Sequence, residues 1–480
     1  MSCREKCGVF LACDFNGNPI ALRLYWGLVS QNHRGHHSYG FLSFDGKQLR
    51  RHCGLGLVPS LRRFLSEGLP AQLEGSRGIA HVRYATSGRG EPDVLLREAQ
   101  PFLMGKLALA FNGNLVNVSS LKSELGGGSC DVELMAGKLL KEFRDLPSAV
   151  ESFMRSAEGA YSVVGMTQEG EMFAFRDPLG IRPLCWGKAN GLYAVSSETV
   201  GLDINNIPYE SEVEPGELIL WRGETVERKK VAESRGRALC AFEFAYFARP
   251  DSILNGGRPV YKVREEFGRN LAREHSEIAK KADVVISIPE TGDDAAYGFH
   301  EQAGIRWERA VRKHRFITDR AFISSSAQRE LILSRKINVS REIKGKKVAV
   351  IDDSIVRGDT SRKIVQQIRE AGATEVYLFV TFPKIIAPCF YGIDMATFGE
   401  LIASKQGEEE IARTVGADAV CYQSLESFVR ATGLRREELC LGCLTCQYPT
   451  PLAQRMADHM REKFLAGERE AGRIYETLSL

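Results

Sequence analysis

The strongest constraint on the fold is a strand–loop–helix–strand pattern in the second half of this 480-residue chain. Lys347–Ile351 is a short apolar, β-branched run, Thr360–Ala371 carries its apolar residues on one helical face, and Glu375–Val380 is again strand-like. Strands joined through a helix pair in parallel, so these segments predict a βαβ unit of an α/β domain. A further apolar run, Asp283–Pro289, predicts another strand. Such sheets bind their ligands at the carboxyl ends of the strands.

The first half of the chain, from Cys7 to about Trp221, consists of short strand-like runs separated by glycine and asparagine turns. Helical spacing occurs at Leu24–Gln31 and again at Val132–Phe143. Strands interleaved with a few helices predict a layered α+β domain. The predicted strands are Gly8–Ala12, Gly78–Arg83, Lys106–Phe111, Tyr161–Met166, Met172–Arg176 and Leu218–Trp221. The charged stretch Arg222–Arg237 predicts an exposed connection, with an edge strand inside it as the alternative.

Composition excludes several classes of protein. The chain has 64 Lys and Arg against 61 Asp and Glu, and a net charge of +3 argues against a protein that coats nucleic acid. No run of about 18 apolar residues is present, and Asp14 interrupts the apolar start, so we expect neither a membrane span nor a signal peptide. The expected compartment is the cytoplasm, where clustered cysteines among the 12 present favour metal binding or catalysis over disulfides.

Two adjacent carboxylates, Asp352 and Asp353, follow the apolar strand and precede a glycine-containing loop. The helix after this loop begins with free backbone N–H groups and a positive dipole end, which suit a phosphate, while paired carboxylates suit sugar hydroxyls. The alternative is an ordinary strand-to-helix turn, capped by Asp359 or Thr360. Because adjacent acids at a buried strand end are costly without a partner, we favour a binding site.

The segment Val350–Ser361 resembles the ribose-phosphate signature of type I phosphoribosyltransferases, whose usual donor is 5-phosphoribosyl-1-pyrophosphate (PRPP). Together with the helix that ends in Arg-Glu-Ala-Gly-Ala, it is similar to the amidophosphoribosyltransferases, which open purine synthesis. The resemblance implies carboxylates on the ribose hydroxyls, a loop around the 5′-phosphate and Mg²⁺ at the pyrophosphate. The implied PRPP residues are Asp352, Asp353, Ser354, Arg357, Gly358, Asp359, Thr360, Ser361 and Lys313, with Mg²⁺ near Glu290, Thr291, Asp352 and Asp353.

That family joins the phosphoribosyltransferase to an N-terminal nucleophile glutaminase, and the first half carries matching motifs. Cys7 resembles the nucleophile, which would use its own α-amine as the base once Met1–Lys6 is removed as a propeptide. The alternative for Cys7 alone is a buried strand cysteine. The resemblance further implies that Arg83 clamps the glutamine carboxylate, Asp131 binds its amine, and Asn112 and Gly113 form the oxyanion hole.

Some members of the family carry a [4Fe–4S] cluster held by four cysteines from distant segments. The four corresponding positions are filled here by Cys240, Cys389, Cys440 and Cys443. A Cys-x-x-Cys pair alone is a weak signal, for which structural zinc is the ordinary alternative. Cys446 stands where the family usually has glycine, and is either a spare thiol or a competing ligand.

The resemblance implies an αββα-layered, Ntn-hydrolase-like domain followed by an α/β parallel-sheet domain. The expected boundaries are a propeptide at 1–6, a class II glutamine amidotransferase domain at 7–235, a phosphoribosyltransferase domain at 236–455 and a helical tail at 456–480. The implied enzyme converts glutamine and PRPP to 5-phosphoribosylamine, glutamate and pyrophosphate. Family members are usually dimers or tetramers, so a homo-oligomer is expected, with no nucleic acid or membrane partner.

Three departures from the family pattern leave other functions open. Phe111 replaces the usual His, Asp359 replaces a common Thr of the phosphate loop, and the lid-like segment Lys313–Ile323 drifts from the family. An inward acid at 359 would repel a phosphate dianion. The alternatives are a paralogue whose glutaminase serves another phosphosugar and a non-catalytic regulatory or sensor partner. Retention of Cys7 and Arg83 argues against the second.

Overall fold

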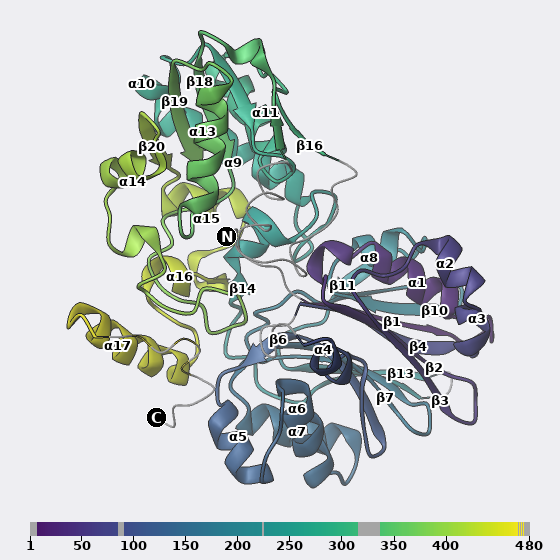
Figure 1. Ribbon diagram of the computed structural model, residues 1–480. Helices are drawn as coiled ribbons and strands as arrows, with labels where there is room; N and C mark the ends of the chain where they lie inside the picture. The colour runs from purple at the N-terminus through teal and green to yellow at the C-terminus, as the bar shows by residue number, and fades with distance from the viewer. Residues whose placement is uncertain are drawn as a thin grey trace.

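The computed structural model describes residues 7–84, 91–222, 225–314 and 337–468, together with residues 470, 472 and 474. Two large antiparallel sheets occupy the N-terminal part, and a smaller parallel sheet occupies the C-terminal part (Figure 1). Within the described ranges, no helix is both long and apolar enough to cross a membrane. The predicted propeptide Met1–Lys6 lies outside the described residues.

The first sheet has seven strands in the order β11-β9-β10-β1-β4-β2-β3, all antiparallel. Its strands are β1 (Gly8–Asp14), β2 (Ser38–Phe44), β3 (Leu49–Leu55), β4 (Arg77–Arg83), β9 (Cys185–Ala189), β10 (Leu192–Ser196) and β11 (Tyr209–Glu212). Its outer face is covered by α1 (Ala21–Val29), the 3₁₀ turn η1 (Asn32–Arg34), α2 (Leu61–Ser66), α3 (Leu69–Gln72) and α8 (Val200–Asp203).

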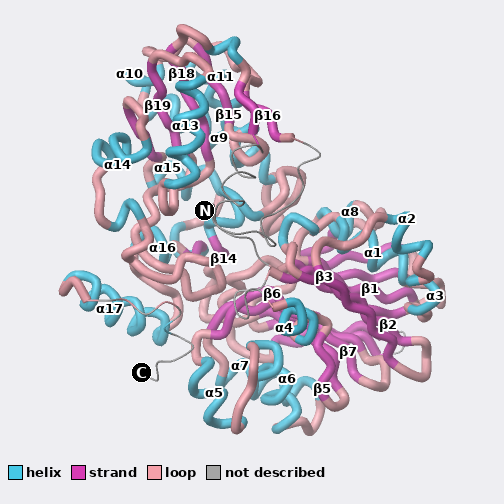
Figure 2. Tube along the Cα trace, viewed as in Figure 1, coloured by secondary structure: helices cyan, strands magenta, loops and turns pink. Residues whose placement is uncertain are grey.

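The second sheet has six strands in the order β13-β12-β8-β7-β6-β5. They are β5 (Phe102–Met104), β6 (Leu107–Leu115), β7 (Gly159–Thr167), β8 (Met172–Arg176), β12 (Glu217–Arg222) and β13 (Thr225–Lys230). Helices α5 (Val118–Leu125), α6 (Asp131–Lys141) and α7 (Leu146–Ser156) pack on its outer face, while the short α4 (Pro92–Arg97) lies beside β3. Figure 2 shows the magenta strands of both sheets gathered between two groups of cyan helices.

Alternation along β1 explains the four layers. Val9 and Leu11 face the second sheet and pack with Val164 and Trp221, whereas Phe10 faces the helices on the other side. Both faces of the strand are therefore buried, and its sequence from Gly8 to Cys13 is apolar instead of alternating. The αββα-layered fold predicted for this part is confirmed, as is the α/β class of the part that follows.

The C-terminal part is built on a parallel sheet of order β15-β18-β19-β20. These strands are β15 (Val284–Ser287), β18 (Lys347–Asp352), β19 (Glu375–Val380) and β20 (Ala419–Tyr422). The accompanying helices are η2 (Glu243–Phe247), α9 (Val260–Glu274), α10 (Ser276–Ala279), α11 (Asp293–Ala303), η3 (Arg341–Ile343), α13 (Asp359–Glu370), η4 (Ile402–Ser404), α14 (Glu408–Val415), α15 (Leu425–Thr432), η5 (Arg436–Glu438), α16 (Gly442–Thr445) and α17 (Pro451–Leu465). Two small sheets pair β14 (Leu239–Cys240) with β21 (Leu439–Cys440), and β16 (Val311–Lys313) with β17 (Ile337–Val339).

The predicted βαβ unit is confirmed as β18–α13–β19, with parallel pairing between its strands. Within the charged stretch 222–237 the alternative is correct, because β13 forms an edge strand on β12. The C-terminal helix α17 begins at Pro451 and ends at Leu465, and Gly467 follows in a left-handed conformation (φ +74°). A left-handed glycine just beyond the last turn is a common way for a helix to stop.

Candidate functional site

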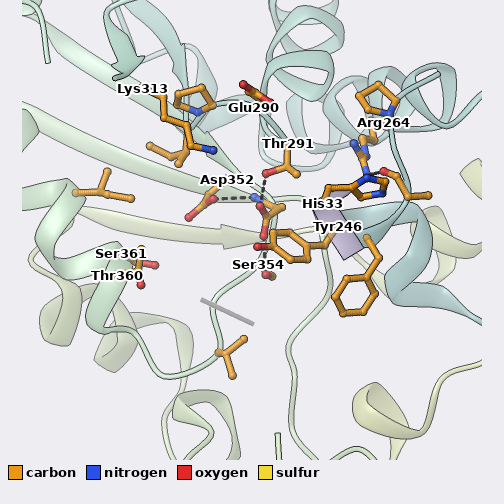
Figure 3. Close-up of a pocket in the computed structure, with 18 of the residues that line it drawn as sticks. His33, Tyr246, Arg264, Glu290, Thr291, Lys313, Asp352, Ser354, Thr360 and Ser361 are labelled. Atoms are coloured by element: carbon orange, nitrogen blue, oxygen red, sulfur yellow. Dashed lines mark hydrogen bonds between the residues drawn. The ribbon is translucent and has the colours of Figure 1, made fainter. Parts of the chain in front are cut away.

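A cavity of about 370 Å³ opens at the carboxyl ends of β15 and β18, where a parallel sheet is expected to bind its ligand (Figure 3). Of the residues predicted from the sequence to bind PRPP or Mg²⁺, only Asp359 does not line this cavity. Those that line it are Lys313, Glu290, Thr291, Asp352, Asp353, Ser354, Arg357, Gly358, Thr360 and Ser361. Residues more than 60 positions apart are thus brought together as the resemblance implied.

The start of α13 forms the end of the cavity that the sequence predicts to bind a phosphate. Gly358 precedes the helix in a left-handed conformation (φ +83°), and a Cβ there would lie 2.8 Å from Ile402 Cδ1, so glycine is required. Thr360 and Ser361 of the first turn line the cavity. Their backbone N–H groups belong to the unsatisfied set at a helix N-terminus, and the dipole of this 12-residue helix favours an anion there.

Asp359 directs its side chain away from the cavity. The carboxylate is 59% exposed and lies 3.6 Å from the Arg362 guanidinium on the helix surface. The expected contribution of this side chain to donor binding is therefore not supported. The physical reason is helix geometry, since successive residues of the first turn point in different directions. The Asp359 carboxylate therefore does not face, and would not repel, a phosphate bound in the cavity.

The paired carboxylates are buried at the tip of β18. Asp352 accepts a hydrogen bond from the Asp353 N–H (2.9 Å), and Asp353 accepts from the hydroxyls of Ser354 (2.6 Å) and Thr291. Burial raises the pKa of both acids, and the charge of Asp353 raises that of Asp352 further. Two buried acids with raised pKa values are the donor set of a hard cation or of sugar hydroxyls.

Several residues at the other end of the cavity were not predicted from the sequence as site residues, among them His33, Tyr246, Arg249 and Arg264. Arg264 is 2% exposed and donates to the carbonyls of Phe244 (2.9 Å) and Ala248 (2.7 Å). A signal was present, because Arg264 lies on the apolar face of α9, four residues after Val260. A cation on a buried helix face calls for a charged partner or ligand.

Lys313 and Arg357 both line the cavity, but the Lys313 side chain is exposed, whereas the Arg357 guanidinium is held by an ion pair. Lys313 is the last residue of β16 and is exposed, while the remainder of the predicted lid, from residue 315 to Ile323, lies outside the described residues. Arg357 pairs with Glu400, whose second oxygen accepts the N–H of Thr397 (2.9 Å). The Arg357 guanidinium is therefore positioned before any ligand binds.

Cys7 directly precedes β1 at the junction of the two parts. Gly8 is opposite Val82 on β4, so continuing this antiparallel register sets Cys7 opposite Arg83. The Cys7 side chain is partly exposed. The residue is thus at the open end of a strand, which disfavours the alternative of a buried strand cysteine.

The predicted oxyanion residues lie on β6. Asn112 is fully buried, and within the described part of the chain neither its Nδ2 nor its Oδ1 has a hydrogen-bond partner. Gly113 has φ +154°, and a Cβ on it would fall 1.8 Å from the Ala160 carbonyl oxygen of β7. An unpaired buried amide is costly, so its presence indicates a group reserved for a ligand.

The segment before Asn112 is fixed by two side chains. His81 Nε2 lies 3.1 Å from the Phe111 carbonyl oxygen, and Gln100 Oε1 accepts the Phe111 N–H (2.8 Å). Burial and the nearby Arg83 lower the pKa of His81 to about 3, so its ring is neutral and Nε2 donates. Two hydrogen bonds therefore hold the main chain of Phe111, although Phe111 replaces the histidine expected at this position.

The two predicted glutamine-binding residues have protein partners in this structure. Arg83 Nη2 pairs with Glu98 at 2.5 Å. Arg83 Nη1 is buried and has no partner among the described residues, which exclude 85–90. Asp131, the first residue of α6, accepts the Leu115 N–H at 2.9 Å. Arg83 thus keeps one nitrogen for a carboxylate, and Asp131 is anchored to the end of β6.

A buried charge cluster joins the N- and C-terminal parts. Arg34 pairs with Glu198 and with Glu243 (2.5 Å), and Arg182 pairs with Glu243 (3.1 Å). All four side chains are at most 1% exposed. Arg182 also donates to the Tyr391 carbonyl (2.8 Å). Paired and hydrogen-bonded charges of this kind fix the relative position of the segments that carry them.

The four predicted cluster cysteines converge beside the small sheet β14–β21. Cys240 and Cys440 are opposite each other, and Cys389 is near enough to raise the pKa of both thiols, although burial is the larger cause. The Cys443 carbonyl accepts the N–H groups of Ile386 (2.9 Å) and Ala387 (3.1 Å), just before Cys389. Burial also raises the pKa of the Cys446 thiol, which is near the same group.

None of the described cysteines forms a disulfide. Across the described ranges, no three His, Cys, Asp or Glu side chains are gathered closely enough to hold a single metal ion. Three of the four thiols are buried, and Cys389 is partly buried. Four thiols from three distant segments still match the donor set of an iron–sulfur cluster, whose sulfur ligands are spread around several metal atoms.

Comparison with known proteins gives a consistent result. A family model described as a glutamine amidotransferase domain matches residues 89–203. The amidophosphoribosyltransferase of Methanocaldococcus jannaschii is 40% identical over 473 residues, covering 92% of this chain and 98% of that protein. The amidophosphoribosyltransferase of Methanothermobacter thermautotrophicus is 37% identical over 472 residues, covering 95% and 97%. The solved structure of glutamine PRPP amidotransferase from Bacillus subtilis, complexed with ADP and GMP, has a TM-score of 0.84 at 37% identity, covering 93% and 98%.

Proposed function

The chain belongs to the amidophosphoribosyltransferase family, and we propose that its two sites divide the family's reaction between them. It converts glutamine and PRPP to 5-phosphoribosylamine, glutamate and pyrophosphate, the first step of purine biosynthesis. We assign glutamine hydrolysis to residues 7–235 and phosphoribosyl transfer to residues 236–455. The observation that carries this assignment is the cavity where the buried acid pair of β18 meets the N-terminus of α13.

In the glutamine half-reaction, the Cys7 thiol attacks the substrate carboxamide, and its own α-amine accepts the proton once Met1–Lys6 has been removed. The unpartnered Asn112 amide and the Gly113 N–H donate to the oxygen that becomes negative. Arg83 offers its unpaired nitrogen to the substrate carboxylate, and Asp131 accepts from the substrate amine. Ammonia leaves, and water releases glutamate from the thioester.

In the phosphoribosyl half-reaction, Thr360, Ser361 and the start of α13 hold the 5′-phosphate. Asp352 and Asp353 accept hydrogen bonds from the ribose hydroxyls. The ammonia nitrogen attacks C1 as the bond from C1 to pyrophosphate breaks. A bound Mg²⁺ near Glu290, Thr291 and the acid pair would neutralise charge on these acids and on the pyrophosphate, which the raised pKa values favour.

We further propose that Cys240, Cys389, Cys440 and Cys443 hold a [4Fe–4S] cluster with a structural role. The cluster would join the C-terminal segment around α16 to the segment of Cys389. That segment is already tied to the glutaminase, because the Asn114 amide next to the oxyanion residues donates to the Phe390 carbonyl (3.0 Å). We also expect a homo-oligomer, which light scattering would test.

The division of labour is tested by separating the two half-reactions. Cys7→Ala should lose glutamine-dependent pyrophosphate release from PRPP but keep ammonium-dependent release, whereas Asp353→Asn should lose both. Release by Cys7→Ala with glutamine, or full activity of Asp353→Asn with ammonium, would contradict the assignment. The outward position of Asp359 removes the main reason to favour another phosphosugar acceptor.

A further inference from the structure

Among the described residues of the N-terminal part, one, His33, lines the phosphoribosyl cavity. Its ring is 29% exposed and belongs to the 3₁₀ turn η1. Figure 3 shows His33 beside Tyr246, on the side of the cavity away from Thr360 and Ser361. The ring is thus at the end of the cavity opposite the helix that is proposed to hold the 5′-phosphate.

Glu198 fixes the tautomer of this ring. His33 Nε2 lies 2.7 Å from Glu198 Oε1, and the other carboxylate oxygen accepts the Arg249 N–H (2.8 Å) and the Ser252 hydroxyl (2.5 Å). Although burial alone would raise it, the charge of Arg34 and the hydrogen bond from His33 hold the pKa of Glu198 well below its usual value. An ionised carboxylate only accepts hydrogen bonds, so Nε2 carries the proton.

In the neutral ring, the second nitrogen, Nδ1, therefore has a free lone pair. No residue in the described part of the chain donates a hydrogen bond to it. A histidine that lines a cavity, is oriented through one nitrogen by a buried carboxylate and has no partner among the described residues on the other nitrogen has the arrangement of a proton acceptor. The charged side chains that share its surroundings are Glu198, Arg34, Arg249 and Arg264.

The position of η1 in the chain places His33 between the two sites. The next residue, Arg34, lies beside the start of β1, since a Cβ on Gly8 would be 3.3 Å from Arg34 Cδ, and Gly8 follows Cys7. Consecutive residues of one turn thus contact the start of the nucleophile strand and the phosphoribosyl cavity. Ammonia released at Cys7 would enter the cavity from this side.

We propose that His33 is a catalytic residue of phosphoribosyl transfer, an inference that rests on the proposed assignment of this cavity. Its Nδ1 accepts one N–H of the incoming ammonia and orients the nitrogen lone pair toward C1. The lone pair forms the N–C1 bond while the C1–O bond breaks and its electron pair leaves with pyrophosphate. The resulting C1 ammonium group gives one proton to Nδ1, and Glu198 stabilises the imidazolium until water removes that proton.

The test is ammonium-dependent pyrophosphate release by His33→Gln, whose amide can still donate to Glu198 but cannot take a proton. We expect kcat to fall about 100-fold, with the KM for PRPP and the rate of glutamine hydrolysis changed by less than about threefold. Imidazole should restore at least about tenfold activity to His33→Ala. The matched control is His275→Gln, since His275 also uses Nε2, 2.8 Å from the Tyr422 carbonyl, but lies outside this cavity.

The proposal is overturned if His33→Gln keeps its kcat with ammonium, if only its KM for PRPP rises, or if imidazole restores nothing to His33→Ala. A wild-type enzyme that releases no pyrophosphate from PRPP with ammonium would instead overturn the assignment of the cavity. The two failures are therefore distinguishable.

Discussion

For Asn112→Ala, the structure predicts a large loss of activity without a loss of stability. The variant removes one of two donors to the oxyanion of the glutamine half-reaction. Loss of one such donor costs about 10²–10³ in kcat, or about 2.7–4 kcal/mol of transition-state stabilisation. We therefore expect glutamate release to fall by that factor, while ammonium-dependent pyrophosphate release, which does not use Asn112, stays unchanged.

Stability should behave unlike that of an ordinary core truncation, which costs about 2–5 kcal/mol. Asn112 is fully buried, and neither of its amide atoms has a partner among the described residues. Each buried unpaired polar group costs about 1–3 kcal/mol, so removing the amide offsets the small cavity that alanine leaves. We expect the free energy of unfolding in urea to be within about 1 kcal/mol of wild type, or higher.

The matched control is Asn114→Ala, two residues along the same strand. The Asn114 amide donates to the carbonyls of Leu115 (2.9 Å) and Phe390 (3.0 Å), so its loss should lower the free energy of unfolding by about 1–3 kcal/mol. The reasoning is refuted if Asn112→Ala is destabilised as much as the control while glutamate release persists. That result would make Asn112 a packing residue.

Further predictions concern charge and metal. Asp352→Asn should abolish PRPP turnover yet raise the free energy of unfolding at pH 7, as measured in urea, because burial disfavours the ionised pair. The sign follows from the raised pKa: the native state binds protons that the unfolded state has lost, so without ligand stability falls as pH rises above about 3.8. Arg34→Met should lower the free energy of unfolding by about 3–5 kcal/mol, because it leaves two buried glutamates without their shared partner. Anaerobically purified protein should contain iron that is lost in Cys440→Ser and kept in Cys446→Ser, as measured by iron content and visible absorbance.

Local periodicity was sufficient to predict the elements around the phosphoribosyl cavity. The apolar run of β18, the amphipathic pattern of α13 and the acids between them are contiguous in sequence, so their relative positions follow from a single βαβ unit. β1 was also predicted, although its burial on both faces hides the alternation that normally identifies a strand.

The orientation of single side chains and contacts between distant segments could not be predicted. Asp359 is in the predicted loop, but one residue of helix rotation decides whether its carboxylate faces a phosphate or solvent. His33 enters the cavity from a segment more than 300 residues away from Asp352, and only the packing of the two parts creates that contact. Glu98 gave no signal of its pairing with Arg83, because an ion pair between strand and loop has no sequence period.

The charge cluster at the junction has a consequence for how such a chain can be divided or recombined. Arg34, Arg182 and Glu198 precede residue 235 and Glu243 follows it, so separation there would leave one part with an excess positive charge and the other with a bare carboxylate. In either fragment, burial of these unpaired charges would be strongly destabilising. A chimaera assembled from halves of different relatives would therefore have to keep all four of these residues, or replace them together.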